Sequence, residues 1–378
     1  MQTYNGQLNQ NEVLAGVWNM IISQQVFSDN IYETKETLSD MSRVDGSLYG
    51  DTKLYYSTDV LKSYEWGADA EAQNLLKLHR PESPECQAIT IDKFRMIPVT
   101  VDQYLSKRAF ATEGAFAAFN SQILGWIRDT KRVYDSTLFN TYIGTTSSAI
   151  GKQSKEIILP VEPEGVDDYN TEAYNRICAQ AIATEMADLM VDLEDVTREY
   201  NDYGNLRSFN VDDLVFVWNA EQVNKIRKLD MPTIFHKEGL VDKFAQHTLP
   251  ARYFGNVNTT SGTTGATNLV IRSLIEKDYN AVEPNNPAYD AKKHIFPGDL
   301  LPANTPYEAY ETYGQDSTIV CKIYHKNSIP FMTAFETGTE FYNPRSLTET
   351  HYLIWGYNTL EYLKNYPFVT VKAIAVAA

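Results

Sequence analysis

The sequence predicts an α+β fold in which helices and antiparallel strands occupy separate blocks of the chain. Three observations predict this class. A long amphipathic helix is expected over residues 112–143, two β-rich runs at 53–61 and 86–101 precede it, and the chain from residue 318 onward is rich in strand-forming residues.

The expected helix at 112–143 is the longest element of the chain. Thr112 stands where an N-cap is expected and Gly144 where a C-terminal stop is expected. At ~1.5 Å per residue the helix would be roughly 45 Å long, enough to span a flat subunit from end to end. The apolar residues that recur every three or four positions along one face are Phe116, Phe119, Ile123, Trp126, Ile127, Tyr134, Leu138 and Tyr142.

The composition limits the class of protein. The chain has 378 residues, of which 43% are hydrophobic, enough for two or three domains with real cores. The formal net charge of −16 disfavours tight binding to nucleic acid or anionic lipid. Because it has neither a signal-peptide pattern nor an apolar run of about 18 residues, we expect a non-secreted protein without a membrane segment. Cys86, Cys178 and Cys321 are far apart, which indicates reduced, cytosolic folding rather than a disulfide frame.

The first fifty residues combine an amphipathic helix with a polar segment. Asn9 and Glu12 have the spacing of a capping box, and residues 29–50 are polar and weakly patterned. Two interpretations stay open: an arm whose helix binds another subunit, and a helix docked on its own domain. The apolar face of this helix includes Val13, Val17, Trp18 and Ile21.

The two β-rich runs predict a long hairpin. Residues 53–61 and 86–101 would form its strands, joined by an apolar insert that contains Trp66, Leu75 and Leu76. Because a two-stranded ribbon is marginally stable in water, we expect this hairpin to lie on a partner subunit. The cationic side chains expected to point into solvent are Lys53, Lys62, Lys93 and Arg95.

The rest of the chain alternates between further helices and strands. We expect helices at 169–197 and after Asn219, with Asn219 as the N-cap of the second, and a flexible loop at 255–268. The expected face of the helix at 169–197 includes Ile177, Cys178, Ile182, Leu189 and Leu193, and the expected strands are 157–161, 213–218, 318–324, 350–361 and 368–376.

The chain carries no catalytic or metal-binding motif. The six histidines show no ligand spacing, and His325 is interpreted as a packed or surface residue. We therefore expect no enzymatic activity, no cofactor and no metal. The carboxylates Asp188, Asp192, Glu194, Asp195, Glu199 and Asp202 are interpreted as a solvated face opposite the apolar stripe.

The order of the expected elements resembles the major capsid proteins of tailed bacteriophages with the HK97-type fold. Three stretches support it: the strand at 213–218 with its following helix, the lead-in at 200–204, and residues 343–347 followed by Tyr352 and Trp355. The last stretch is similar to the capsid proteins of small short-tailed phages of the phi29 type.

The resemblance implies a domain organisation. An N-terminal arm would cover residues 1–50, an extended E-loop hairpin 51–108, a P-domain with the spine helix 109–166, an A-domain 167–317, and closing P-domain strands 318–378.

The resemblance also implies a function and partners. Pentamers and hexamers of this chain would build an icosahedral shell around phage double-stranded DNA, which the acidic chain would contact only weakly and non-specifically. Because only about fifty residues precede the hairpin, a separate scaffolding protein is expected, with a portal protein and no membrane. The chain would reside in the virion, and in the host cytoplasm during assembly. The inter-subunit contacts would include Val13, Val17, Trp18, Ile21, Lys62, Trp66, Leu75 and Leu76.

Two alternatives stay open. An encapsulin-like nanocompartment would share the fold but enclose protein cargo. A monomeric carbohydrate-active hydrolase would also be acidic and rich in tyrosine. The assembly state of the purified protein separates the hydrolase from the shell proteins.

Overall fold

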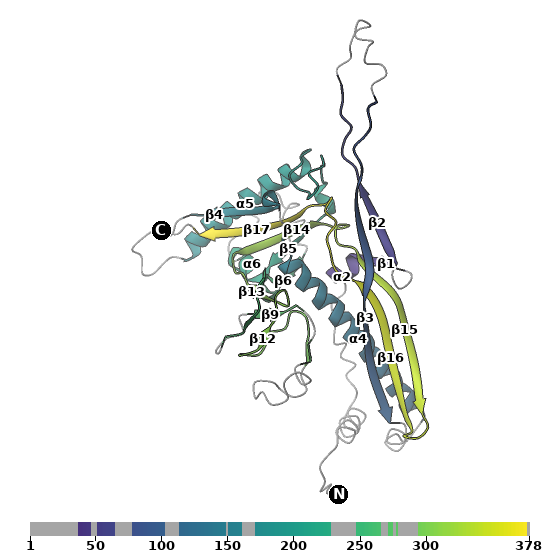
Figure 1. Ribbon diagram of the computed structural model, residues 1–378. Coiled ribbons are helices and arrows are strands. Elements are labelled where there is room, and N and C mark those ends of the chain that lie inside the picture. Colours follow the sequence, from purple (N-terminus) through teal and green to yellow (C-terminus); the bar gives the residue numbers. More distant parts are fainter. Residues whose placement is uncertain are drawn as a thin grey trace. The chain divides into compact units, whose positions relative to one another are not determined.

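The computed structural model describes residues 37–46, 51–64, 78–102, 113–148, 150–160, 171–227, 247–265, 271–274, 277–278 and 294–375. The chain, drawn in Figure 1, divides into two compact units. Unit 1 comprises Met1–Asp51, Thr90–Ser136 and Phe331–Thr359, and unit 2 comprises Thr52–Ile89, Thr137–Pro330 and Leu360–Ala378.

Unit 1 is built on long antiparallel strands. In Figure 1, β3, β16 and β15 run side by side, and their sheet has the order β1-β15-β16-β3-β2. The short helix α2 (Leu38–Met41) precedes β1, which pairs in parallel with β15. The strands of this sheet are β1 (Arg43–Asp45), β2 (Thr52–Ser57), β3 (Glu85–Asp102), β15 (Phe331–Asn343) and β16 (Thr348–Asn358), of which β2 and the first residues of β3 belong to unit 2.

These strands confirm both predicted hairpin strands and the predicted strand at 350–361. Strand β15 is absent from the sequence prediction. Its segment contains Glu336, Gly338 and Glu340, and both residue types are depleted in strands. Pairing with β16 stabilises this segment as a strand, and that pairing is a tertiary contact.

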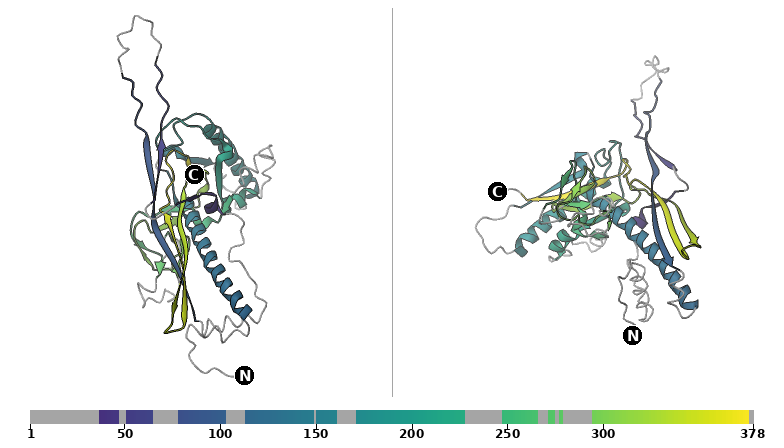
Figure 2. Two further views of the ribbon diagram at one scale, coloured as in Figure 1. Left: turned by 90° about the vertical axis from the view of Figure 1, so that its right-hand side faces the viewer. Right: turned by 60° about the horizontal axis from the view of Figure 1, so that its bottom comes forward.

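Helix α4 (Glu113–Thr145) confirms the predicted long helix and is straight in both views of Figure 2. Within unit 1, Ile127 is buried, whereas its neighbour Trp126 is half exposed. Tyr134 packs edge-on against the Trp355 ring of β16, and its hydroxyl lies 2.8 Å from the Tyr357 hydroxyl. The helix is therefore fixed to the sheet by aromatic packing and a buried hydrogen bond.

Gly144 does not stop this helix. It lies inside α4, and a Cβ at this position would come within 2.1 Å of the Tyr253 carbonyl oxygen. The expected C-terminal stop is therefore wrong, and the glycine is needed because the backbone of Tyr253 approaches so closely.

Unit 2 has its core around a second sheet, of order β4-β17-β14-β5-β6. Strands β14 and β5 are buried along their whole length, as continuous apolar runs predict for central strands. The elements are β4 (Ser154–Leu159), β5 (Leu214–Asn219), β6 (His247–Leu249), β14 (Ile319–His325), β17 (Phe368–Ala375), α5 (Thr171–Glu194) and α6 (Ala220–Arg227).

The helices of unit 2 follow the predicted patterns with one exception. The Asn219 side chain accepts a hydrogen bond from the Glu221 amide, which confirms it as the cap of α6. On α5, Ile182, Leu189 and Leu193 are buried as expected, but Ile177 is 53% exposed. Among the described residues, no helix is both long and apolar enough to span a membrane.

The flexible loop expected at 255–268 is partly wrong. Its described residues include β7, which pairs with β13, and β8, which pairs with β12. Hydrogen bonds between polar side chains stabilise this region; for example, Asn258 Nδ2 donates to Thr312 Oγ1 at 3.0 Å. Such polar contacts produce no hydrophobic pattern in the sequence. The short elements of this region are β7 (Gly255–Val257), β8 (Gly262–Thr263), β9 (Ile271–Ser273), β10 (Lys277–Asp278), β11 (His294–Ile295), β12 (Pro306–Tyr307) and β13 (Thr312–Gln315).

Candidate assembly surface

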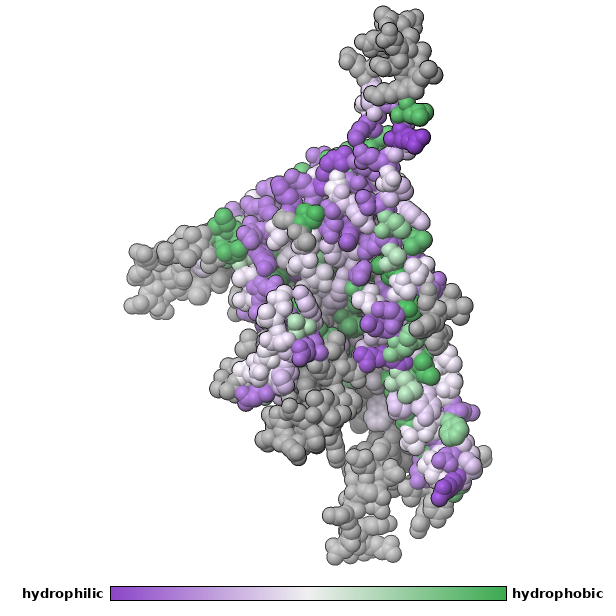
Figure 3. All heavy atoms as spheres, in the orientation of Figure 1, coloured by the Kyte–Doolittle hydropathy of each residue, from purple (hydrophilic) through white to green (hydrophobic). Residues whose placement is uncertain are grey.

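The hairpin formed by β2, β3 and the residues between them exposes large apolar side chains. Leu61 and Leu78 are each 77% exposed, and green side chains stand out near the stem of the hairpin in Figure 3. Contiguous exposed apolar surface commonly marks a protein interface. The other exposed members of this set are Leu54, Tyr56, Val60 and Tyr64.

An ion pair holds the root of the hairpin. Asp59 Oδ2 lies 2.6 Å from Arg198 Nη1, and Asp59 Oδ1 accepts the Leu206 amide at 2.9 Å. The Leu206 hydrogen bond and then the Arg198 side chain lower the pKa of Asp59 to about 2. The carboxylate therefore stays charged over the whole physiological range of pH.

A second hydrogen-bond cluster lies beside this ion pair. The Ser57 hydroxyl donates to Asn365 Oδ1 at 2.6 Å and accepts from Asn205 Nδ2 at 2.8 Å. Arg207 donates to Asn365 Oδ1 and to the Thr58 carbonyl. The hairpin thus starts from a base within unit 2 that several polar contacts hold, which we call the hairpin root (Ser57, Asp59, Arg198, Arg207 and Asn365).

Above the root, two contacts join the two sides of the hairpin, at residues outside β2 and β3. Lys62 Nζ lies 2.7 Å from Glu82 Oε1, and both side chains are exposed. The Tyr64 and His79 rings have their centroids 4.4 Å apart. Exposed ion pairs contribute little stability, so these contacts mainly keep the two sides aligned.

Most of the predicted contact residues lie outside the described residues. Lys62 is described, and its side chain is accessible to a partner. Trp66, Leu75 and Leu76 of the hairpin, and Val13, Val17, Trp18 and Ile21 of the arm, fall on undescribed residues.

The described residues that follow the arm are anchored in unit 1. Thr37 and Asp40 form a capping box at α2, and β1 follows it. Arg43 lies 3.5 Å from Asp135, which is 1% exposed on α4. Burial raises the pKa of the Asp135 carboxyl against the opposing charges of Lys131 and Arg43. The segment that starts at Thr37 is therefore fixed in unit 1.

Arg95 was expected in solvent, and the structure corrects this. Its guanidinium lies 5.6 Å from the centre of the Tyr134 ring. A bulge at Asp92 adds one residue to β3 opposite β16, and this register shift pairs Arg95 with Trp355 on the face toward Tyr134. The Asp92 carboxylate fixes the bulge by accepting hydrogen bonds from the Thr359 amide and hydroxyl, at 2.7 and 2.6 Å.

The acidic residues expected on a solvated face are exposed except for Asp202. Asp202 is half-buried and accepts hydrogen bonds from Ser148 at 2.7 Å, from Gln153 at 2.6 Å and from Tyr362. His325 is packed, with its ring stacked on Tyr366 at 4.5 Å between centroids. These polar groups have structural partners, and no local spacing in the sequence would have revealed them.

Comparison with solved structures identifies the fold. One chain, from the "Structure of head fiber and inner core protein gp22 of native bacteriophage P68", aligns with a TM-score of 0.57 and 11% identity, covering 90% of this chain and 86% of that chain. Another, from the "Capsid structure of Staphylococcus phage Andhra", aligns with a TM-score of 0.56 and 10% identity, covering 99% of this chain and 94% of that chain. The fold is the HK97-type fold of phage capsid proteins.

The family follows from the sequence. Residues 2–370 match the family model of the Phi29-like phage major capsid protein, and the chain belongs to this family. No curated protein sequence matches it. The chain is therefore a major capsid protein of an icosahedral phage shell and a component of the virion, which supports the capsid over the nanocompartment and hydrolase alternatives.

Proposed function

We propose that the hairpin of β2 and β3 is the E-loop of this capsid protein and lies across the neighbouring subunit of the shell. The observation that carries the proposal is the set of exposed apolar side chains above a root held by ion pairs and hydrogen bonds. A fixed root limits the conformational entropy that the hairpin loses when it binds.

The same proposal assigns the domains. Residues 1–50 are the arm that binds an adjacent subunit, 51–108 the E-loop, and 109–166 the P-domain with its spine helix. Residues 167–317 are the A-domain, which packs around the capsomer centre, and 318–378 are the closing P-domain strands. Each contact can be modest, because symmetry repeats it in every pentamer and hexamer of the shell.

The proposal extends to the contents and partners of the shell. Double-stranded DNA fills it with only weak contacts, because a chain of net charge −16 repels phosphates. A separate scaffolding protein and a portal protein take part in assembly in the host cytoplasm. The chain itself catalyses no reaction, and its role in the particle is mechanical.

The experiment that tests the E-loop assignment replaces two exposed leucines. Leu61→Asp with Leu78→Asp should abolish assembly when the chain is expressed with its scaffolding protein, because burying two carboxylates against a partner is costly. Electron microscopy and sedimentation measure assembly, and circular dichroism of the soluble subunit should be unchanged.

A matched control uses the same two positions. Leu61→Met with Leu78→Met keeps both side chains apolar and should give normal shells. Normal shells from the aspartate variant would show that this hairpin does not contact a neighbour.

A further inference from the structure

Three side chains of unit 1 bring metal-binding atoms together on β15 and β16. Glu340, Glu349 and His351 each offer one ligand atom, and these atoms all lie within 4.8 Å of one another. Glu340 pairs directly with His351 across the two strands, and Glu349 precedes His351 by two residues. All three side chains therefore project from the same face of the sheet.

The ion pair between His351 and Glu349 accounts for only two of the three side chains. The distance from His351 Nε2 to Glu349 Oε1 is 3.8 Å, which is longer than a hydrogen bond. Two carboxylates beside one imidazole also place like charges next to each other, and their repulsion disfavours the cluster. A bound cation removes that repulsion.

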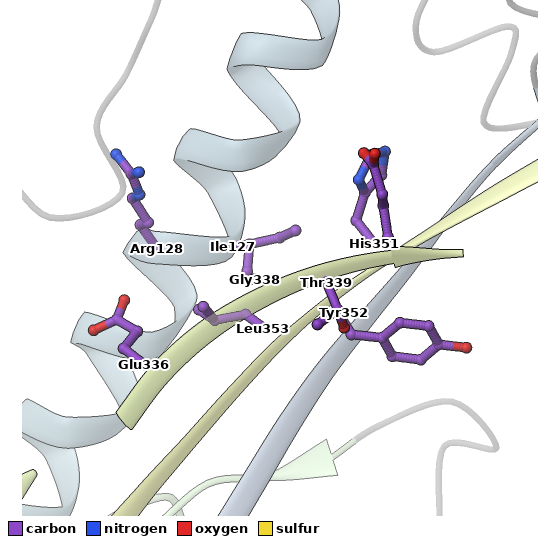
Figure 4. A pocket seen from close by; sticks show the side chains of 9 residues that line it. Ile127, Arg128, Glu336, Gly338, Thr339, His351, Tyr352 and Leu353 are labelled. Atoms are coloured by element: carbon purple, nitrogen blue, oxygen red, sulfur yellow. The ribbon is translucent and has the colours of Figure 1, made fainter. Parts of the chain in front are cut away.

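A pocket adjoins the cluster. Its walls come from α4 and from the two strands, and Figure 4 shows Arg128 and Glu336 at one end and His351 toward the other. Glu340 and His351 both line it, together with the apolar side chains of Ile127 and Leu353. The side chains of His351 and Glu349 are only 15% and 19% exposed. Two of the three side chains are thus sheltered, whereas Glu340 is exposed, and the pocket leaves room for water ligands.

We propose that Glu340, Glu349 and His351 bind a divalent transition-metal ion, with Zn²⁺ as the preferred ion. Ligands in a tetrahedral zinc site lie about 3.3–3.6 Å apart, given metal–ligand distances of about 2.0–2.2 Å. Small rotations of three side chains close the gap from the observed separations. An imidazole ligand favours Zn²⁺ over Mg²⁺ or Ca²⁺, which take oxygen ligands, and water completes the coordination.

Such an ion would cross-link β15 to β16 close to the turn that joins them. Glu340 belongs to β15, whereas Glu349 and His351 belong to β16. The metal would therefore link two strands that are already paired by backbone hydrogen bonds. Metal binding would therefore raise the melting temperature of the protein, because the three ligands come together only when β15 and β16 are folded and paired.

The test measures metal content of the full-length protein. After removal of metal with EDTA, incubation with Zn²⁺ and dialysis, we expect about one Zn²⁺ per chain by atomic emission. His351→Ala and Glu340→Gln should each weaken Zn²⁺ binding about tenfold or more. Co²⁺ in place of Zn²⁺ should give visible absorption bands that change in His351→Ala.

Two controls keep the result interpretable. Glu340→Gln changes an exposed side chain without changing its shape and removes one of the two like charges, so in EDTA it should melt no lower than the wild type. His79→Ala removes an exposed histidine elsewhere and should leave Zn²⁺ binding unchanged. Failure of the wild type to retain Zn²⁺, or equal retention by His351→Ala, would overturn the proposal. The proposal would also be overturned if the protein bound Ca²⁺ in preference to Zn²⁺ and the His351→Ala variant still bound Ca²⁺.

Discussion

Lys322 is a fully buried lysine in the central strand β14 of unit 2. Its ammonium donates to the Thr146 carbonyl at 2.7 Å, to Thr370 Oγ1 at 2.8 Å and to Ser147 Oγ at 3.2 Å. Thr146 directly follows the C-terminus of α4, where the helix dipole favours a cation. Burial, and then the charge of Lys372, nevertheless lower the pKa of Lys322 to about 7.

This pKa predicts how stability depends on pH. Between about pH 7 and the pKa of an unfolded lysine, about 10.4, the unfolded chain binds a proton that the folded chain lacks, so stability rises with pH. Relative to Lys322→Met, the free energy of unfolding of the wild type should increase by at most about 1.4 kcal/mol per pH unit in this range. Urea unfolding of the soluble subunit at several pH values measures it, and a difference independent of pH would refute the assignment.

Asp316 shows the opposite sign of shift. Burial acts to raise its pKa, but hydrogen bonds from Thr318 and the charge of Lys372 outweigh burial and lower the pKa of Asp316 to about 2. A lowered carboxyl pKa contributes stability above its unfolded value of about 3.9, and this contribution is lost as the pH falls toward 2. Lys322 and Asp316 together favour neutral to mildly alkaline conditions for the folded subunit.

At the scale of elements, the hairpin depends on its root. The root joins residues of the 52–59 segment to residues near 200 and to Asn365, which are far apart in the chain. Above it, the described segments 60–64 and 78–84 are exposed and have no regular secondary structure. Their order therefore comes mainly from the polar contacts at their base.

Removing one root contact should loosen the hairpin without unfolding the subunit. Asp59→Ala leaves Arg198 without its carboxylate partner and the Leu206 amide without its acceptor. We expect faster amide hydrogen exchange in β2 and in the first residues of β3, slower assembly, and an unchanged core.

Glu82→Gln is the matched control for that variant. It removes the exposed ion pair with Lys62 but leaves the root intact, so exchange in β2 should stay at the wild-type rate. Equal exchange rates in Asp59→Ala and the wild type would show that the root does not order the hairpin.

At the scale of the whole molecule, each unit is assembled from three separate segments of the chain. Strand β3 and helix α4 each contain residues of both units. Neither unit is a continuous stretch, so truncating the chain at either boundary would remove strands from a sheet. The proposed contacts with other subunits, by contrast, come from the arm and the hairpin, which can change without removing any core strand.

That separation predicts the behaviour of a double variant. Trp18→Ala with Trp66→Asp should prevent assembly while the circular dichroism of the soluble subunit stays nearly unchanged, because both residues are proposed to contact neighbouring copies. Size-exclusion chromatography and negative-stain microscopy measure assembly. Loss of the subunit fold itself would contradict the arm and hairpin assignments.

Elements with strong periodicity were predictable from the sequence. The long helix α4, the strand–helix unit of β5 and α6, and both hairpin strands follow from apolar spacing, because burial of one face imposes it. Strand β15 escaped prediction because Glu336, Gly338 and Glu340 interrupt its pattern. The strands β7 and β8 escaped because polar hydrogen bonds hold them.

The sites depended on contacts that no local pattern records. Asp59 meets Arg198 across 139 positions of the chain, and Glu340 meets His351 only because β15 and β16 pair in one register. The bulge at Asp92 likewise turns Arg95 inward by shifting the register between β3 and β16. Periodicity reports which face of an element is buried, so the sequence determined the strongly periodic elements and their order. Which distant side chains meet depends on register and packing, and only the tertiary structure decided that.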